Sequence, residues 1–179
     1  MNMVVITGSP HKKGTSALLT ERFLQGAKEG KNNVFLFHGA FEKVHPCIGC
    51  DVCGMGKNPC VFHDSMTSLY EALKNADMVV FVTPLYYHGM SAQIKTVIDR
   101  FHGIDDLLRH KNKKAILIVT AASDEKRIMN GVVGSYEETL HYLGWQNAGT
   151  LLAYGCYSRE DIEKTDYPKK AYEMGRAVK

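Results

Sequence analysis

The sequence predicts an α/β fold in which a parallel sheet carries helices on both faces. Short apolar runs alternate with helical segments from one end of the chain to the other, and this alternation is typical of a parallel sheet. The runs are apolar at consecutive positions, as expected for strands that are buried on both faces. We therefore expect five strands in one layer between two layers of helices.

Each element has its own local signal. Strands are predicted at residues 3–6, 34–37, 78–83 and 115–120, with a weaker one near 149–155. The helix predicted over 15–29 has its apolar residues at helical spacing, and Thr15 is a suitable N-cap. Further helices are predicted over 64–76 with Asp64 as N-cap, over 91–102, before Gly144, and over 167–178.

Length and composition limit the classes of protein that need to be considered. The 179 residues suit a single domain spanning 1–179. A nucleic-acid-binding protein usually has a basic stripe or a higher pI, and the net charge here is only +3. We see neither a signal peptide nor an apolar stretch that could cross a membrane, so we expect a cytoplasmic protein. Its five cysteines are then expected to be thiols or metal ligands rather than disulfides.

Two strand orders suit this pattern, a flavodoxin-like order and a dinucleotide-binding order. Both place ligands at the carboxyl ends of the strands, where the strand order reverses. The residues that follow the first, third and fourth strands are therefore the candidates for a binding site.

The loop that follows the first strand has the composition of a phosphate-binding loop. Gly8 and Gly14 allow tight turns, and the hydroxyls of Ser9, Thr15 and Ser16 can donate to an anion at the start of the next helix. His11, Lys12 and Lys13 add positive charge at the rim. Neither GxGxxG nor GxxxxGK[ST] is present.

This loop resembles the FMN-phosphate loop of the NAD(P)H-dependent FMN reductases and iron–sulfur flavoproteins. The resemblance rests on Gly8-Ser9-Pro10 followed by Gly14-Thr15-Ser16, and it implies that Ser9, Thr15 and Ser16 contact the phosphate. It also implies a flavodoxin-like sheet of order 2-1-3-4-5. His11, Lys13 and Gly14 are included in the predicted cofactor site.

The loops after the third and fourth strands are predicted to hold the flavin ring. Pro84, Leu85, Tyr86 and Tyr87 provide apolar and aromatic wall material, and this run resembles the isoalloxazine-binding segment of the same family. After the fourth strand, the small residues Ala121 and Ala122 allow the backbone to approach a ligand.

Four cysteines lie in an irregular segment over 39–63. Cys47, Cys50, Cys53 and Cys60 are spaced so that their thiolates could surround one cubane cluster. The spacing resembles the cysteine motif of iron–sulfur flavoproteins, which carry one [4Fe-4S] cluster beside FMN. Free thiols and a four-cysteine zinc site remain as alternatives. In a flavodoxin-like order this segment would leave the second strand beside the phosphate loop, near the flavin.

Together these features predict an oxidoreductase that passes electrons from NAD(P)H through FMN to an acceptor. A cluster, if present, would hand them to a ferredoxin-like carrier. The alternatives are a quinone or nitro reductase, a flavodoxin-type electron carrier and a redox sensor that uses the cysteines as a thiol switch. No acid–base residue is predicted, because hydride transfer to a flavin needs none. The resemblance implies a homodimer or homotetramer.

Overall fold

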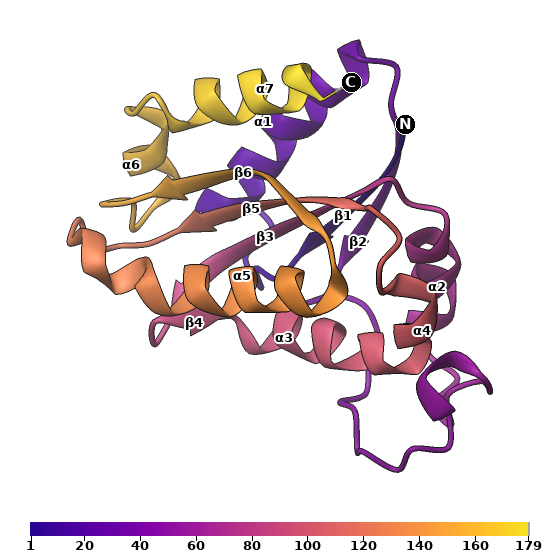
Figure 1. Ribbon diagram of the computed structural model, residues 1–179. Coiled ribbons are helices and arrows are strands. Elements are labelled where there is room, and N and C mark those ends of the chain that lie inside the picture. Colours follow the sequence, from indigo (N-terminus) through magenta and orange to yellow (C-terminus); the bar gives the residue numbers. More distant parts are fainter. Residues whose placement is uncertain (179) are drawn as a thin grey trace.

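The structure, a computed structural model, describes residues 1–178 and contains one six-stranded sheet (Figure 1). Five parallel strands follow the order β2-β1-β3-β5-β6, and β4 pairs with β3 outside this path. The strands are β1 (Asn2–Thr7), β2 (Asn33–His38), β3 (Met78–Tyr86), β4 (Gly89–Met90), β5 (Lys114–Thr120) and β6 (Gln146–Ala153). The five predicted strands and their flavodoxin-like order are thus confirmed.

The sixth strand is a correction to the predicted count of five. Strand β3 continues beyond Pro84, and Leu85 pairs with Met90 in a short antiparallel hairpin. The hairpin turns at Tyr87 and His88, whose φ angles are 47° and 63°. Positive φ at both positions is typical of a type I′ hairpin turn, which usually contains glycine or asparagine. Tyr87 and His88 are neither, so this turn could not be predicted from the residue types.

Helices cover both faces of the sheet (Figure 1). One layer contains α1 (Thr15–Glu29), α6 (Arg159–Glu163) and α7 (Tyr167–Ala177). The other contains α2 (Met66–Lys74), α3 (Ala92–Asp99), α4 (Asp105–Leu108) and α5 (Asn130–Leu143). Short 3-10 turns complete the set: η1 (Gly54–Gly56), η2 (Arg100–Ile104), which continues α3, and η3 (Lys126–Met129).

The central strands divide the apolar core into two parts. In β1, Met3 and Val5 pack with α1, whereas Val4 and Ile6 pack with the opposite helix layer. Helices α1 and α7 approach each other through Gly26 and Gly175, where an added Cβ would collide with backbone atoms of the other helix. This close contact seats α1, and therefore the loop that precedes it, firmly on the sheet.

Two predicted helix caps differ from the structure. Gly14, rather than Thr15, is the N-cap of α1, and no side chain caps the helix. Thr15 is instead the first helical residue. The cap of α2 is Ser65, but the side chain of Asp64 does accept a hydrogen bond from the Met66 amide at 3.0 Å. Asp64 therefore lies one residue before the N-cap, and its side chain still stabilises the start of the helix.

Candidate functional site

The loop between β1 and α1 is shaped for an anion. Gly14 donates its amide to the His11 carbonyl at 3.2 Å, which closes a turn, and the His11 amide donates to Ser9 Oγ at 3.2 Å. Because α1 has no side-chain cap, the amides of its first turn keep their hydrogen-bonding capacity. Free amides at a helix start, together with the helix dipole, favour a negatively charged group.

Three hydroxyls join this loop to the end of β5. Thr15 Oγ1 donates to Thr120 Oγ1 at 3.0 Å, and Ser16 Oγ lies 2.8 Å from the same atom. Ser16 and Thr120 are almost fully buried. The contact links two segments that are about a hundred residues apart in the chain, and it fixes the start of α1 against the carboxyl edge of the sheet.

A cavity of about 790 Å³ opens at this edge. The loops after β1, β3, β5 and β6 contribute to its wall, as expected at the carboxyl ends of parallel strands. The lining residues are Ser9, Pro10, His11, Lys12, Lys13, Gly14, Thr15, Pro84, Leu85, Tyr86, Thr120, Ala122, Cys156, Tyr157, Ser158 and Arg159. The three loops that the sequence selected thus meet at one site.

Three of the predicted residues do not line this cavity. Ser16 is buried in contact with Thr120 and lines a neighbouring cavity, and Ala121 is also buried. Tyr87 is fully exposed at the tip of the β3–β4 hairpin. The wall formed by residues 156–159 was missed as a site, because the weak strand near 149–155 gave no indication that the loop after it approaches the others.

The cavity wall is positively charged. Among the described residues, its ionisable side chains are His11, Lys12, Lys13, Arg159, Cys156, Tyr86 and Tyr157, with no carboxylate. Lys12 stacks over the ring of Phe41 at 4.9 Å, and Arg159 forms ion pairs with Glu21 and Glu163. Burial raises the pKa of Cys156, which keeps it a neutral thiol at neutral pH. The site therefore suits an anionic ligand.

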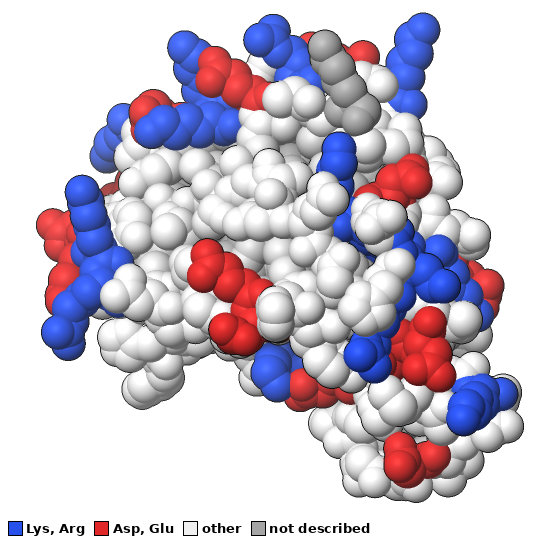
Figure 2. Space-filling model, in the orientation of Figure 1, with Lys and Arg blue, Asp and Glu red and all other residues white. Residues whose placement is uncertain are grey.

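The four clustered cysteines surround a second, much smaller cavity of about 20 Å³. Cys53 is buried, Cys60 is half-buried, and Cys47 and Cys50 are exposed. Arg100 and His102 also line this cavity. The segment projects from the body of the protein near α2 and α4 (Figure 1) and carries few charged side chains on the face shown in Figure 2.

The expected position of the cysteines beside the phosphate loop is wrong. The segment does begin there, because the Gly39 amide donates to the Thr7 carbonyl at 2.8 Å. The cysteines, however, pack against η2: Cys53 Sγ lies 3.9 Å from the His102 carbonyl oxygen. Helix α3 separates η2 from the carboxyl edge, and its eight residues span about 12 Å. The connection is long enough to carry the cysteines to the far end of that helix.

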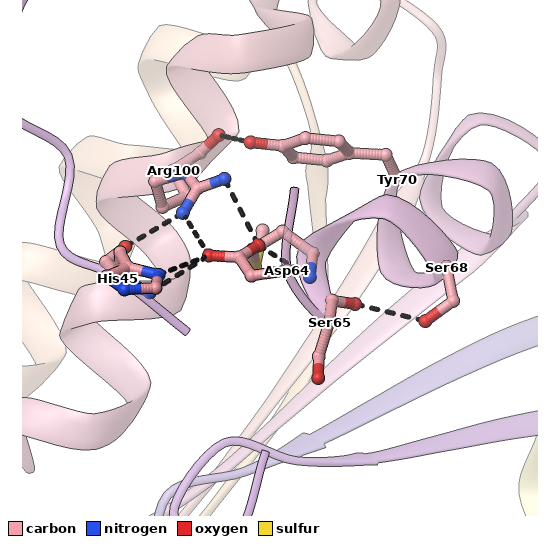
Figure 3. A network of polar contacts seen from close by, with 7 residues as sticks. His45, Asp64, Ser65, Ser68, Tyr70 and Arg100 are labelled. Carbon is pink, nitrogen blue, oxygen red and sulfur yellow. Dashed lines mark hydrogen bonds and ion pairs between the residues drawn. The ribbon is translucent and has the colours of Figure 1, made fainter. Parts of the chain in front are cut away.

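A buried ion pair fixes both ends of the cysteine segment (Figure 3). Arg100 Nη1 donates to Asp64 Oδ2 and to the His45 carbonyl, each at 2.8 Å, and Nη2 donates to Asp64 Oδ1 at 3.3 Å. Burial opposes ionisation of Asp64, but the hydrogen bonds from Arg100 and from two amides outweigh it and lower its pKa. Tyr70 donates to the Arg100 carbonyl at 2.7 Å, and burial raises the pKa of Tyr70 to about 12.

The fold and the position of the larger cavity define the class as flavodoxin-like α/β proteins with a ligand site at the carboxyl edge of the sheet. The chain belongs to the NADPH-dependent FMN reductase family, whose model matches residues 1–152. It is accordingly an NAD(P)H-dependent flavin oxidoreductase. Among the described residues, no helix is both long and apolar enough to cross a membrane.

Individual relatives agree with this assignment. An iron–sulfur flavoprotein of Methanocaldococcus jannaschii is 28% identical, with both chains covered completely. An iron–sulfur flavoprotein of Archaeoglobus fulgidus is 42% identical over 98 residues, which are 55% of this chain and 49% of that protein. The NAD(P)H:quinone oxidoreductase of Methanothermobacter marburgensis shares the fold, with a TM-score of 0.78 at 16% identity over 99% of this chain and 95% of that one.

The cysteines match an iron–sulfur cluster in number and kind. All four are free thiols and line one cavity. Among the described residues, no three His, Cys, Asp or Glu side chains are grouped closely enough to hold a metal ion, so the four thiols as placed do not converge on a zinc ion or on a cluster. The cavity admits about one water molecule, so a cluster would displace the exposed arm that carries Cys47 and Cys50.

Proposed function

We propose that this oxidoreductase binds FMN in the cavity of about 790 Å³ and transfers electrons from NAD(P)H to an external acceptor. The observation that carries the proposal is the meeting of an anion-binding loop and an apolar, aromatic wall in one cavity. Ser9, Gly14 and Thr15 would hold the phosphate, with His11 and Lys13 at the rim. The ring would lie against Pro84, Leu85, Tyr86 and the Ala121–Ala122 backbone.

The protein's own part in the reaction is positioning. When bound, FMN would accept the hydride and release electrons to the acceptor. The first turn of α1 would hold the phosphate, and the loop after β3 would provide a wall against the ring. The basic wall residues Lys12, Lys13 and Arg159 would attract the phosphates of the nicotinamide cofactor. No proton needs to be held by a side chain.

The test compares FMN with riboflavin, which lacks the phosphate. When the flavin-free protein is titrated with each flavin and the quenching of flavin fluorescence is followed, FMN should bind much more tightly than riboflavin. The reason is that charge-assisted hydrogen bonds contribute about 1.5–3 kcal/mol each. Thr15→Ala should weaken FMN binding about tenfold and leave riboflavin binding unchanged. Thr96→Ala, in α3 and outside the cavity wall, is the matched control. Equal affinity of the wild-type protein for both flavins would refute the proposal.

Turnover measurements identify the acceptor. Rapid anaerobic oxidation of NADPH by the FMN-loaded protein is expected only when a suitable acceptor is present, and a quinone, a nitroaromatic compound and a ferredoxin-like protein should be compared. A flavodoxin-type carrier would show no NADPH oxidation with any of them.

We further propose that Cys47, Cys50, Cys53 and Cys60 bind a [4Fe-4S] cluster. Their shared cavity and the names of the relatives support this proposal. Iron and sulfide analysis of anaerobically purified protein should give about four of each per chain. Cys53→Ser should lose most of this iron, whereas Cys156→Ser, which changes the cysteine outside the segment, should retain it. A wild-type protein that contains zinc or no metal would contradict the proposal.

The state of assembly is part of the same proposal. A homodimer or homotetramer is expected from the resemblance to the family, and a ferredoxin-like carrier is the expected partner of a cluster-containing form. Light scattering of the FMN-loaded protein distinguishes these assemblies from a monomer.

A further inference from the structure

Arg100 lies at the junction between α3 and the cysteine segment. It is the first residue of η2, and only 1% of its side chain is exposed. Its two terminal nitrogens are occupied by Asp64 and by the His45 carbonyl. The partners lie on either side of the cysteines in the sequence, since His45 precedes Cys47 and Asp64 follows Cys60.

The third nitrogen of the guanidinium is different. Arg100 Nε is buried and has no hydrogen-bond partner within residues 1–178. A buried donor without an acceptor costs about 1–3 kcal/mol, and more when the group is charged. A ligand that supplies an acceptor at this position would remove the cost.

The location of Arg100 indicates what that acceptor is. Arg100 lines the small cavity together with all four cysteines of the segment. On one side Phe62 lies over the guanidinium at 5.3 Å, and it also stacks on His45 at 4.8 Å. An aromatic ring provides no lone pair in its plane for a strong hydrogen bond. The side-chain acceptors that line the cavity are the cysteine sulfur atoms and the carboxylate of Asp51, whose Oδ1 already lies 2.9 Å from His102 Nε2.

We infer that Arg100 Nε donates a hydrogen bond to a cysteine thiolate or an inorganic sulfide of the cluster, and thereby raises the reduction potential of that cluster. This inference rests on the proposed cluster. Hydrogen bonds to sulfur and local charge set the potentials of iron–sulfur clusters. Because reduction adds an electron to an already anionic cluster, an N–H donor stabilises the reduced form more than the oxidised form. Arg100 is thus a positioning residue, which acts on the cluster and holds the segment.

A charge-matched substitution tests the inference. Arg100→Lys keeps the positive charge opposite Asp64 but removes the Nε–H donor. In the anaerobically purified protein, a redox titration followed by electron paramagnetic resonance should show a cluster potential more negative than that of the wild-type protein. The iron content of Arg100→Lys should equal that of the wild-type protein, so loss of the cluster would not explain the shift in potential.

Arg109→Lys is the matched control. Within the described part of the chain, Arg109 also has a buried Nε without a partner, but Arg109 pairs with Asp105 and does not line the cysteine cavity. Its substitution should leave the cluster potential unchanged. Equal potentials in the wild-type protein and Arg100→Lys would overturn the inference and leave the cluster proposal intact, whereas wild-type protein without iron would overturn both.

A measurement on the wild-type protein covers the case in which Arg100→Lys does not fold. Protein labelled with 15N at arginine Nε, reduced and studied by pulsed electron paramagnetic resonance, should show one nitrogen coupled to the cluster. The absence of any 15N coupling in protein with full iron content would refute the hydrogen bond.

Discussion

Ser91 joins the first turn of α3 to the start of the phosphate loop: its Oγ donates to the Gly8 carbonyl at 2.8 Å. Its amide donates in turn to Thr83 Oγ1 at 3.0 Å, near the end of β3. The loop after β1 and the loop after β3 are therefore held together by one buried side chain. Since α3 continues directly into Arg100, the same helix spans the distance between the cavity of about 790 Å³ and the cysteine segment.

Gly8→Ala tests this junction. An added Cβ would lie 2.5 Å from Ser91 Oγ and 2.6 Å from Ile94 Cβ, so the two loops would have to separate. We expect a loss of about 1–3 kcal/mol in the free energy of unfolding and weaker FMN binding. Gly134→Ala in α5 is the control, because nothing lies within 4 Å of its added Cβ, and it should raise stability slightly. Urea unfolding and FMN titration measure both effects, and unchanged FMN affinity in Gly8→Ala would contradict the prediction.

Thr120→Val tests the hydroxyl contact with the start of α1. The substitution keeps the shape but leaves the buried hydroxyl of Ser16 without its partner, at a cost of about 1–3 kcal/mol. FMN binding should weaken, because Thr15 loses the same partner. Isothermal titration with FMN checks this prediction, and Thr139→Val on α5 controls for the loss of a threonine hydroxyl elsewhere. A Thr120→Val protein with wild-type affinity would show that the contact does not organise the loop.

Asp64→Asn tests the ion pair that holds the cysteine segment. Removing one partner of a buried pair should cost about 3–5 kcal/mol at neutral pH. The folded-state pKa of Asp64 lies below its ordinary value, so the contribution is complete above about pH 3.9 and is lost as the pH falls through the folded-state pKa. Urea unfolding at several pH values should therefore show the difference between wild type and Asp64→Asn shrinking only in acid. The exposed Asp106→Asn should differ little from the wild type at any pH, and a gap of constant size for Asp64→Asn would contradict the prediction.

The cysteines should differ strongly in reactivity. Cys47 and Cys50 are exposed, whereas Cys156 is buried and its pKa is raised by that burial. A higher pKa lowers the fraction of thiolate, which is the reacting species. In metal-free protein at neutral pH, mass spectrometry should show maleimide labelling of Cys47 and Cys50 well before Cys156. Equal rates in the folded protein would contradict this prediction, and equal rates in urea are the expected control.

The parts of the fold that could be predicted are those with a dense local signal. The strand over 78–83 is apolar at nearly every position, as expected for a strand that is buried on both faces. Its start was predicted correctly, but β3 ends at Tyr86, three residues later than predicted. The loops after β1 and β3 were selected because the carboxyl ends of parallel strands meet at one edge. Both loops do line the same cavity.

The rest depended on contacts between distant residues. Nothing near Cys47 in the sequence shows that its segment reaches the far end of α3, because that placement follows from a pair between Arg100 and Asp64, which are 36 positions apart. The wall around Tyr157 was missed for a related reason, since it reaches the cavity only after β6 has been placed beside β5.

The close glycine contact between α1 and α7 has a consequence for biosynthesis. The end of α1 and the start of α7 are separated by roughly 140 residues of chain, which a ribosome needs about 7 to 28 s to add. During that interval α1 lacks the neighbouring helix against which Gly26 packs. Cofactor uptake is therefore expected to follow translation rather than to accompany it.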